Sequence, residues 1–242
     1  MDLGGPEKEQ WYHATDRELA EGALAHYRAA GDRWGIAQAL TRLGYLAFLR
    51  GDADQCRAIL TECLATARTV GDRQCIAIAL EFLGEATSAE SGAEAGASLN
   101  ESLRLYRELG DLAGVASVEN MLGRLDCLNV RYASGREHYR ASLRLTKDWA
   151  WMLRITGSLD GLAVVAAGQD QPERALRLAA ASARWREEAA TEPSSIEQAE
   201  LDRALVSVRE VLGQAAAAAA WAVGQTMTLE EAIAYALKED DA

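Results

Sequence analysis

The fold is decided by residues 31–71, which read GDRWGIAQALTRLGYLAFLRGDADQCRAILTECLATARTVG. Two residue pairs in this stretch, Gly31-Asp32 and Leu43-Gly44, return along the chain. The Leu-Gly pair recurs at spacings of 40, 39 and 38 residues, as Leu83-Gly84, Leu122-Gly123 and the altered Asp160-Gly161. The opening pair recurs as Gly71-Asp72 and Gly110-Asp111, with Lys147-Asp148 in the fourth position. A period of about 40 residues predicts a stacked array of repeats.

Each repeat is predicted to be a pair of amphipathic helices. In the first half of the unit, Ile36, Leu40, Leu43 and Ala47 share one helical face. In the second half, the matching face holds Cys56, Ile59, Leu60, Cys63, Leu64 and Ala67, and residues 50–52 form the turn. Since neither helix buries its apolar face alone, the pairs must stack on one another.

The glycine of the Leu-Gly pair lies inside a predicted helix, where it costs up to about 1 kcal/mol relative to alanine. A cost that returns in each repeat needs a reason that also returns. We therefore expect a neighbouring helix to approach Gly44 and its equivalents closely, at a position without a Cβ.

The order of Leu40, Leu43-Gly44, Ala47, Cys56, Leu60 and Cys63 resembles the tetratricopeptide repeat, whose usual length is about 34 residues. The longer period implies longer helices. We predict an all-α protein, an α-solenoid of tetratricopeptide-like helix pairs with a period of about 40 residues and a C-terminal helical cap.

Three segments are expected along the chain: a flexible leader (1–14), the repeat array (15–192) and C-terminal capping helices (193–242). The first helix should run from about Thr15 to Ala30. Capping boxes are predicted at Ser195 with Gln198 and at Thr228 with Glu231. They place helices at about 196–212, 214–223 and 229–238.

The C-terminal part is similar to the end of many actinobacterial ATP-binding transcriptional regulators of the LuxR type and related signal-transduction ATPases. The similarity lies in the order of 171–175 (QPERA), 201–205 (LDRAL), Leu212-Gly213 and 229–237 (LEEAIAYAL). It covers roughly residues 15–240. It implies a non-catalytic protein-interaction or effector-sensing module of a bacterial signalling or transcription-regulating system.

Composition argues against several functions. The chain has 242 residues and a formal net charge of −12, which would repel a phosphate backbone, so we expect no nucleic-acid binding by this chain alone. Residues 1–10 are polar, and no apolar run approaches the roughly 18 residues of a membrane span. We therefore expect no membrane insertion and a cytoplasmic location. None of the lysines lies in a phosphate-binding loop motif, so no cofactor is predicted.

The titratable residues form no recognisable catalytic or metal-binding pattern in the sequence. His13, His26 and His138 have no histidine or cysteine partner three or four residues away, and His138 is predicted to lie on an exposed helix face. The four cysteines, Cys56, Cys63, Cys75 and Cys127, are expected to be reduced, buried core residues. With no nucleophile beside a base, we predict that the chain is not an enzyme and holds no metal.

The resemblance to tetratricopeptide repeats implies that the first helix of each pair lines a concave groove. The groove residues it implies are Gln38, Thr41, Tyr45, Phe48, Glu81, Glu85, Ser117, Asn120, Arg124 and Ser158. Their mixed chemistry suits a peptide or protein partner, or a small effector. Two alternatives remain open: that these side chains only solvate an unused groove, and that the chain is a stand-alone scaffold forming a homodimer through its N-terminal half-repeat.

Overall fold

Helices make up the regular structure of this protein in a computed structural model that describes residues 6–146 and 151–238. They are α1 (Pro6–Ala30), α2 (Arg33–Leu49), α3 (Ala53–Val70), α4 (Arg73–Thr87), α5 (Gly92–Leu109), α6 (Leu112–Leu128), α7 (Tyr132–Thr146), α8 (Met152–Gly168), α9 (Pro172–Ala189), α10 (Ser195–Thr226) and α11 (Leu229–Leu237). These two ranges contain no strand. The all-α prediction is confirmed.

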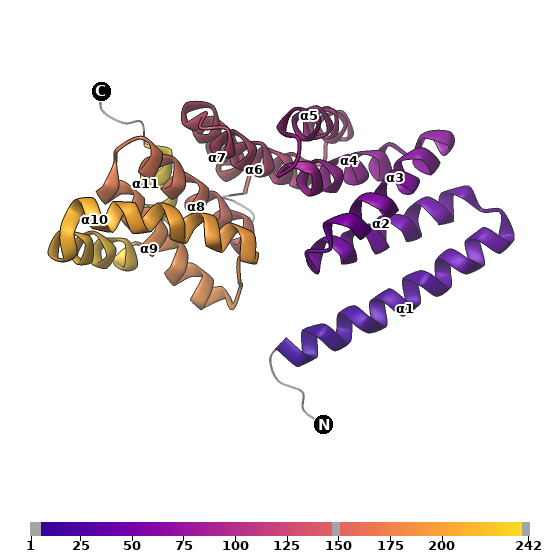
Figure 1. Ribbon diagram of the computed structural model, residues 1–242, viewed down its shortest axis with the longest axis horizontal. Coiled ribbons are helices and arrows are strands. Elements are labelled where there is room, and N and C mark those ends of the chain that lie inside the picture. Colours follow the sequence, from indigo (N-terminus) through magenta and orange to yellow (C-terminus); the bar gives the residue numbers. More distant parts are fainter. Residues whose placement is uncertain (1–5, 147–150, 239–242) are drawn as a thin grey trace. The chain divides into compact units, whose positions relative to one another are not determined.

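The helices fall into two units, residues 1–111 with α1 to α5 and residues 112–242 with α6 to α11. Consecutive helices pack on one another from α1 to α5 in unit 1 and from α6 to α10 in unit 2, as can be followed in Figure 1. The first helix of a pair also contacts the first helix of the next, α2 with α4 in unit 1 and α6 with α8 in unit 2. This packing order is that of the predicted helical repeat array.

The Gly-Asp pairs are the turns between successive pairs of helices. Gly71 has a φ of +71° and ends α3 in the left-handed conformation that glycine adopts without strain. Asp72 then caps α4 by accepting a hydrogen bond from the backbone N–H of Cys75 at 3.0 Å. Gly31 with Asp32 does the same before α2. The fourth pair, Lys147-Asp148, lies outside the described residues.

The glycines of the Leu-Gly pairs lie where two helices approach most closely, as predicted. A Cβ on Gly44 would collide with the side chain of Leu60 on α3. A Cβ on Gly84 would lie 2.7 Å from Cγ of Leu99, and one on Gly123 3.0 Å from the ring of Tyr139. Leu60 and Leu99 are themselves fully buried. In these three pairs the second helix therefore packs against the first at a point where a glycine leaves room for it, whereas a Cβ on Gly161 of α8 would meet the ring of Tyr139 on α7.

The C-terminal region agrees with the predicted breaks and corrects one cap. α10 is interrupted at Gly213, where φ is +73°, so residues 195–212 and 214–226 are two helical segments. The box at Thr228 and Glu231 is confirmed. The first box is formed by Ser194 with Glu197 and not by Ser195 with Gln198. The predicted register is one residue late because Ser194 keeps an extended backbone and its hydroxyl accepts from the N–H of Glu197 at 3.2 Å.

The first helix is longer than expected, since α1 begins at Pro6 rather than near Thr15. Ala20 and Leu24 bury the inner side of α1 in the core of unit 1. Across the chain, the described helices include none whose length and apolar content would let it cross a membrane.

The close approach at Gly44 can be tested against a glycine that has room. We expect Gly44→Ala to lower the free energy of unfolding by about 1–3 kcal/mol, because the buried Leu60 must move. Gly22→Ala on α1 meets no atom within 4 Å and should raise it by up to about 1 kcal/mol through helix propensity. Urea unfolding followed by circular dichroism compares the two, and equal stabilisation by both would contradict the packing argument.

Candidate functional site

The predicted binding residues lie on the first helices of the pairs, six on α2 and α4 in unit 1 and four on α6 and α8 in unit 2. In unit 1, Gln38 donates from Nε2 to Asp72 Oδ2 at 3.1 Å, which ties α2 to the cap of α4. Gln74 and Asp111 form a similar bond one repeat later, also at 3.1 Å. Gln38 is therefore part of the bracing between repeats.

Two further residues of the unit 1 set also have partners inside the fold. The hydroxyl of Thr41 donates to the carbonyl of Ala37 at 2.9 Å and lies 3.2 Å from Sγ of Cys63. Glu81 is only 4% exposed, and its carboxylate accepts from the hydroxyl of Tyr106 at 2.6 Å. These bonds satisfy polar groups that burial would otherwise leave unpaired.

An aromatic cluster remains on the predicted binding face of unit 1. The ring of Phe82 on α4 lies between Tyr45 and Phe48 of α2, with centroid distances of 5.3 and 4.9 Å. All three rings are half-buried, and the guanidinium of Arg42 lies 5.8 Å from the Tyr45 ring centroid. Glu85, which is also half-buried, lies three residues after Phe82 on α4. Tyr45 and Phe48 belong to the predicted groove residues, whereas Phe82 does not.

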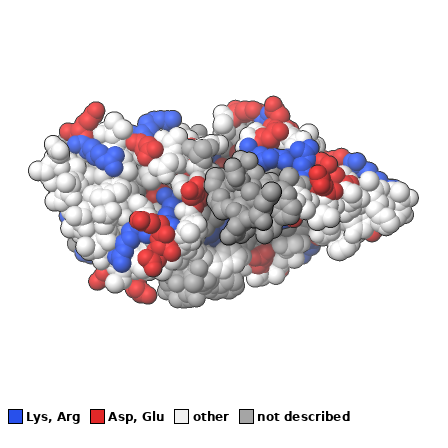
Figure 2. Space-filling view, turned by 90° about the horizontal axis from the view of Figure 1, so that it is seen from below, with Lys and Arg blue, Asp and Glu red and all other residues white. Residues whose placement is uncertain are grey.

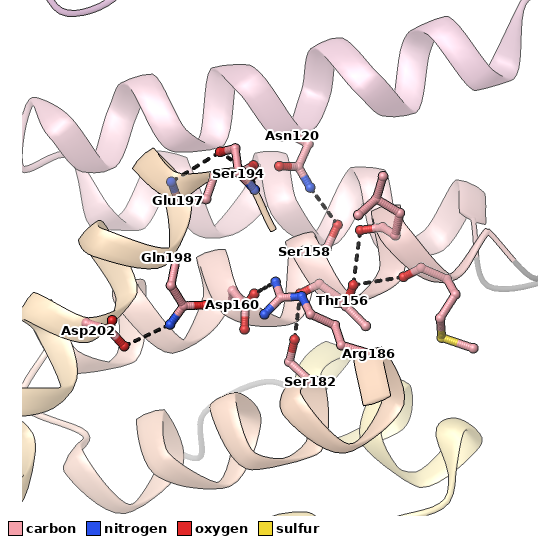
Figure 3. Close-up of polar contacts among 12 residues, drawn as sticks. Asn120, Thr156, Ser158, Asp160, Ser182, Arg186, Ser194, Glu197, Gln198 and Asp202 are labelled. Atoms are coloured by element: carbon pink, nitrogen blue, oxygen red, sulfur yellow. Dashed lines mark hydrogen bonds and ion pairs between the residues drawn. The ribbon is translucent and has the colours of Figure 1, made fainter. Parts of the chain in front are cut away.

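The predicted residues of unit 2 are brought together in hydrogen bonds across three helices. Asn120 on α6 donates to the hydroxyl of Ser158 on α8 at 2.9 Å, as Figure 3 shows. Ser158 lies 3.3 Å from the hydroxyl of Ser142 on α7, which donates to the carbonyl of Ala116 at 2.8 Å. Ser117 is also buried. These side chains hold the helices together.

Arg124 forms a bidentate ion pair with Glu200 of α10. Its Nε and Nη2 donate to the two carboxylate oxygens at 2.9 and 2.7 Å, and the side chains are only 11% and 22% exposed. Bidentate guanidinium–carboxylate pairs are among the strongest polar contacts in proteins. The pair joins α10 to α6 over 76 residues of sequence, which repeat spacing alone does not indicate.

A second buried ion pair, between Asp160 and Arg186, lies in the same unit (Figure 3). Asp160 takes the leucine position of the Leu-Gly pair, and each side chain is 10% exposed. Burial lowers the pKa of Arg186, and the charge of Glu197 opposes that shift. Asp160 Oδ1 and Arg186 Nε have no hydrogen-bond partner within the described residues. The sequence signal for this pair was the acid in an apolar position.

His138 is not on an exposed face, which corrects the prediction. Its Nδ1 lies 2.7 Å from the carboxylate of Glu119, and its side chain is 30% exposed. Glu119 occupies the position of Leu40 and Leu80 in earlier repeats and is 4% exposed. A buried carboxylate at an apolar position needs a polar partner, and the histidine of α7 supplies it.

The cysteines behave as core residues. All four are free thiols, and Cys56, Cys63 and Cys75 are buried, whereas Cys127 is half-buried. Burial raises the pKa of Cys56 to about 11 and the pKa of Cys75 and of Cys127 to about 12. At neutral pH these groups stay protonated and are poor nucleophiles. The described residues contain no cluster of three His, Cys, Asp or Glu side chains that could hold a metal ion.

Comparison with known proteins adds information on the fold. The sequence matches no protein-family model and no curated protein. Among solved structures, it is similar to the crystal structure of BtubC (BKLC) from P. vanneervenii, with a TM-score of 0.60 and 16% sequence identity. The match covers 88% of this chain and 87% of that chain. At this identity, the likeness shows a shared fold and carries no function across.

The Arg124–Glu200 pair leads to a prediction about stability. Glu200→Met removes the bidentate partner of a nearly buried guanidinium and should lower the free energy of unfolding by about 1–3 kcal/mol. Arg124→Met combined with Glu200→Met should recover most of the loss, because both charges are then replaced by apolar volume. A double-mutant cycle in urea measures the coupling.

The matched control for this cycle is the exposed Arg104–Glu108 pair, where Arg104→Met should change stability by no more than about 0.5 kcal/mol. A coupling energy between Arg124 and Glu200 no larger than the stability change caused by Arg104→Met would show that the pair does not hold α10 in place.

Asp72 leads to a prediction about pH. Burial alone would raise the pKa of its carboxyl, but hydrogen bonds from Cys75 and Gln38 outweigh it, so the pKa lies below its usual value. The charged form therefore stabilises the fold above the unfolded-state pKa of about 4, and this contribution is lost as pH falls through the folded pKa. We expect Asp72→Asn to be less stable than wild type at pH 7, with a difference that shrinks toward pH 3.

Urea midpoints measured from pH 7 to pH 3 test this dependence. Asp52→Asn provides the control, because Asp52 is the N-cap of α3 in the same role but at an exposed position. A difference for Asp72→Asn that stays constant over this pH range would contradict the prediction.

Proposed function

We propose that the chain is a non-catalytic protein-interaction or effector-sensing module of a bacterial signalling or transcription-regulating system, acting in the cytoplasm. The proposed ligand is a peptide or protein segment, bound on the first helices of unit 1. The observation that carries the proposal is the half-buried aromatic cluster of Tyr45, Phe48 and Phe82. Aromatic side chains are enriched at protein interfaces, where they supply large contact areas at low entropic cost.

The predicted binding residues differ between the two units in how many internal bonds they form, and this difference favours a binding surface on unit 1. In unit 2, Asn120, Arg124 and Ser158 are engaged with neighbouring helices, so releasing them to a ligand would cost internal bonds. In unit 1, the aromatic rings pack on one another and keep part of their surface exposed. The proposed contact residues are therefore Tyr45, Phe48 and Phe82, with Glu85 beside them on α4.

The charge distribution supports a partner other than nucleic acid. On the face drawn in Figure 2, acidic and basic side chains of the described residues alternate in small groups separated by uncharged surface. Phosphate recognition would need a continuous basic stripe. The net charge of −12 favours partners that are neutral or basic.

Self-association through the N-terminal half-repeat receives less support from the fold. Ala20 and Leu24 of α1 are already buried in the core of unit 1. Among residues 15–30, Leu19 is the large apolar side chain that stays exposed, at 68%. A single exposed leucine is ordinary for a protein surface.

Selection from a displayed random-peptide library on the full chain tests the proposed function. We expect enriched peptides to bind with measurable affinity by fluorescence polarisation and to lose at least about tenfold when the binding protein carries Tyr45→Ala or Phe82→Leu, since each removes aromatic contact area. Trp151→Gln, at a 39%-exposed tryptophan of unit 2, is the control and should leave binding unchanged.

Circular dichroism of each variant verifies that the helices are retained. Peptides that bind the Tyr45→Ala, Phe82→Leu and wild-type chains equally would place the interaction elsewhere, and a selection without enrichment would argue against peptide binding.

A further inference from the structure

The last helix, α11, lies on unit 2 as a separate amphipathic element. It contacts α7, α8 and α9, which precede it in sequence by some 40 to 105 residues. Ala232 and Ala236 are fully buried, Ile233 is 8% exposed, and Leu229 and Leu237 pack on the same core. This spacing is how an amphipathic helix binds in a groove, with anchors at i, i+3, i+4, i+7 and i+8.

Two arginines hold the C-terminal end of α11 by its backbone. Arg140 on α7 donates from Nη2 to the carbonyl of Lys238 at 2.6 Å. Arg174 on α9 donates from Nη2 to the carbonyls of Tyr235 and Ala236 at 3.1 and 3.3 Å. Its guanidinium also lies 5.0 Å from the centroid of the Tyr235 ring. The last carbonyls of a helix lack intrahelical partners and carry its negative dipole, so guanidinium groups bind them well.

The helix before α11 is held independently of it. Arg184 donates from Nη1 to the carbonyl of Gln225 at 3.1 Å, and Gly224 packs against the backbone of Arg177 so closely that a Cβ would collide with it. Only Met227 and Thr228 separate α10 from α11. α11 has nine residues, too few to be stable as an isolated helix. Its order therefore depends on the surface that binds it.

We propose that the surface of α7, α8 and α9 that binds α11 also takes α11 of a second copy, so that two chains pair by exchanging residues 229–238. The docked helix itself argues for this occupant. Ala232 and Ala236 are fully buried against this surface, and the two arginines donate to backbone carbonyls at the C-terminal end of the helix.

A second copy presents the same anchors in the same order and needs no new interface. Exchange of an identical element between two protomers is a low-cost route to a dimer. The proposal involves α11 and unit 2 only, so it stands or falls independently of peptide binding by unit 1.

A complementation experiment with two full-length variants tests the exchange. In the first, Arg140→Met and Arg174→Met weaken the surface but leave α11 intact. In the second, Ala232→Glu and Ala236→Glu prevent α11 from docking but leave the surface intact. We expect each variant alone to have the mass of one chain by light scattering, and their equimolar mixture to contain a species of twice that mass. The wild type should show the same species in a proportion that rises with concentration.

A mixture that keeps the mass of one chain would overturn the proposal, as would a wild type that stays monomeric at every concentration. Circular dichroism verifies that both variants are folded. As a second measurement, a fluorescent peptide of residues 227–238 should bind the Ala232→Glu/Ala236→Glu chain and lose roughly tenfold in affinity when Arg174→Met is added. Peptide binding without pairing of the two variants would make the surface a receptor for some other helix and would reject the second copy as its occupant.

Discussion

The architecture depends on one steric constraint, the absence of a side chain on the first helix of each of the first three pairs where the second helix crosses it. At Gly44 and Gly84 the space is taken by Leu60 and Leu99, which are fully buried. Because each leucine fills the gap left by a glycine, the two helices are fixed in register as well as in distance. The Gly-Asp turns then set how one pair follows the next. Gly71 ends a helix in a conformation that other residues avoid, and Asp72 starts the following helix while accepting a bond from Gln38 of the previous pair.

These features were predictable because they are local and periodic. The positions of the Leu-Gly pairs, the close approach of the second helix, the break at Gly213 and the cap at Thr228 all follow from residue types within a few positions of each other. The start of α1 and the register of the cap at Ser194 did not follow, since helix ends are set by competition between neighbouring residues with similar capping ability.

The candidate site was less predictable than the fold because repeat position does not reveal what a side chain contacts. Arg124 occupies a predicted groove position, yet its partner Glu200 comes from a distant helix that no periodic rule connects to it. The same holds for His138 and Glu119. A polar residue in an apolar position indicates that a polar partner is present, but the sequence does not identify that partner. Phe82 stands outside the predicted groove set because it lies one residue after Glu81, and only the fold brings its ring against those of Tyr45 and Phe48.

The long-range bonds of unit 2 also bear on how the chain folds as it is synthesised. In unit 1, the Gln38–Asp72 and Gln74–Asp111 bonds join residues 34 and 37 positions apart, so each pair of helices has its partners soon after it emerges. In unit 2, Arg124 cannot form its ion pair until Glu200 has been synthesised. Arg140 cannot bond the carbonyl of Lys238 until that residue, 98 positions later, has been added. Contacts of large sequence separation form late, because a long loop must close first. The first unit can therefore complete its fold early, whereas in the second unit Arg124, Arg140 and the surrounding apolar surface stay exposed until Glu200 and Lys238 have been synthesised.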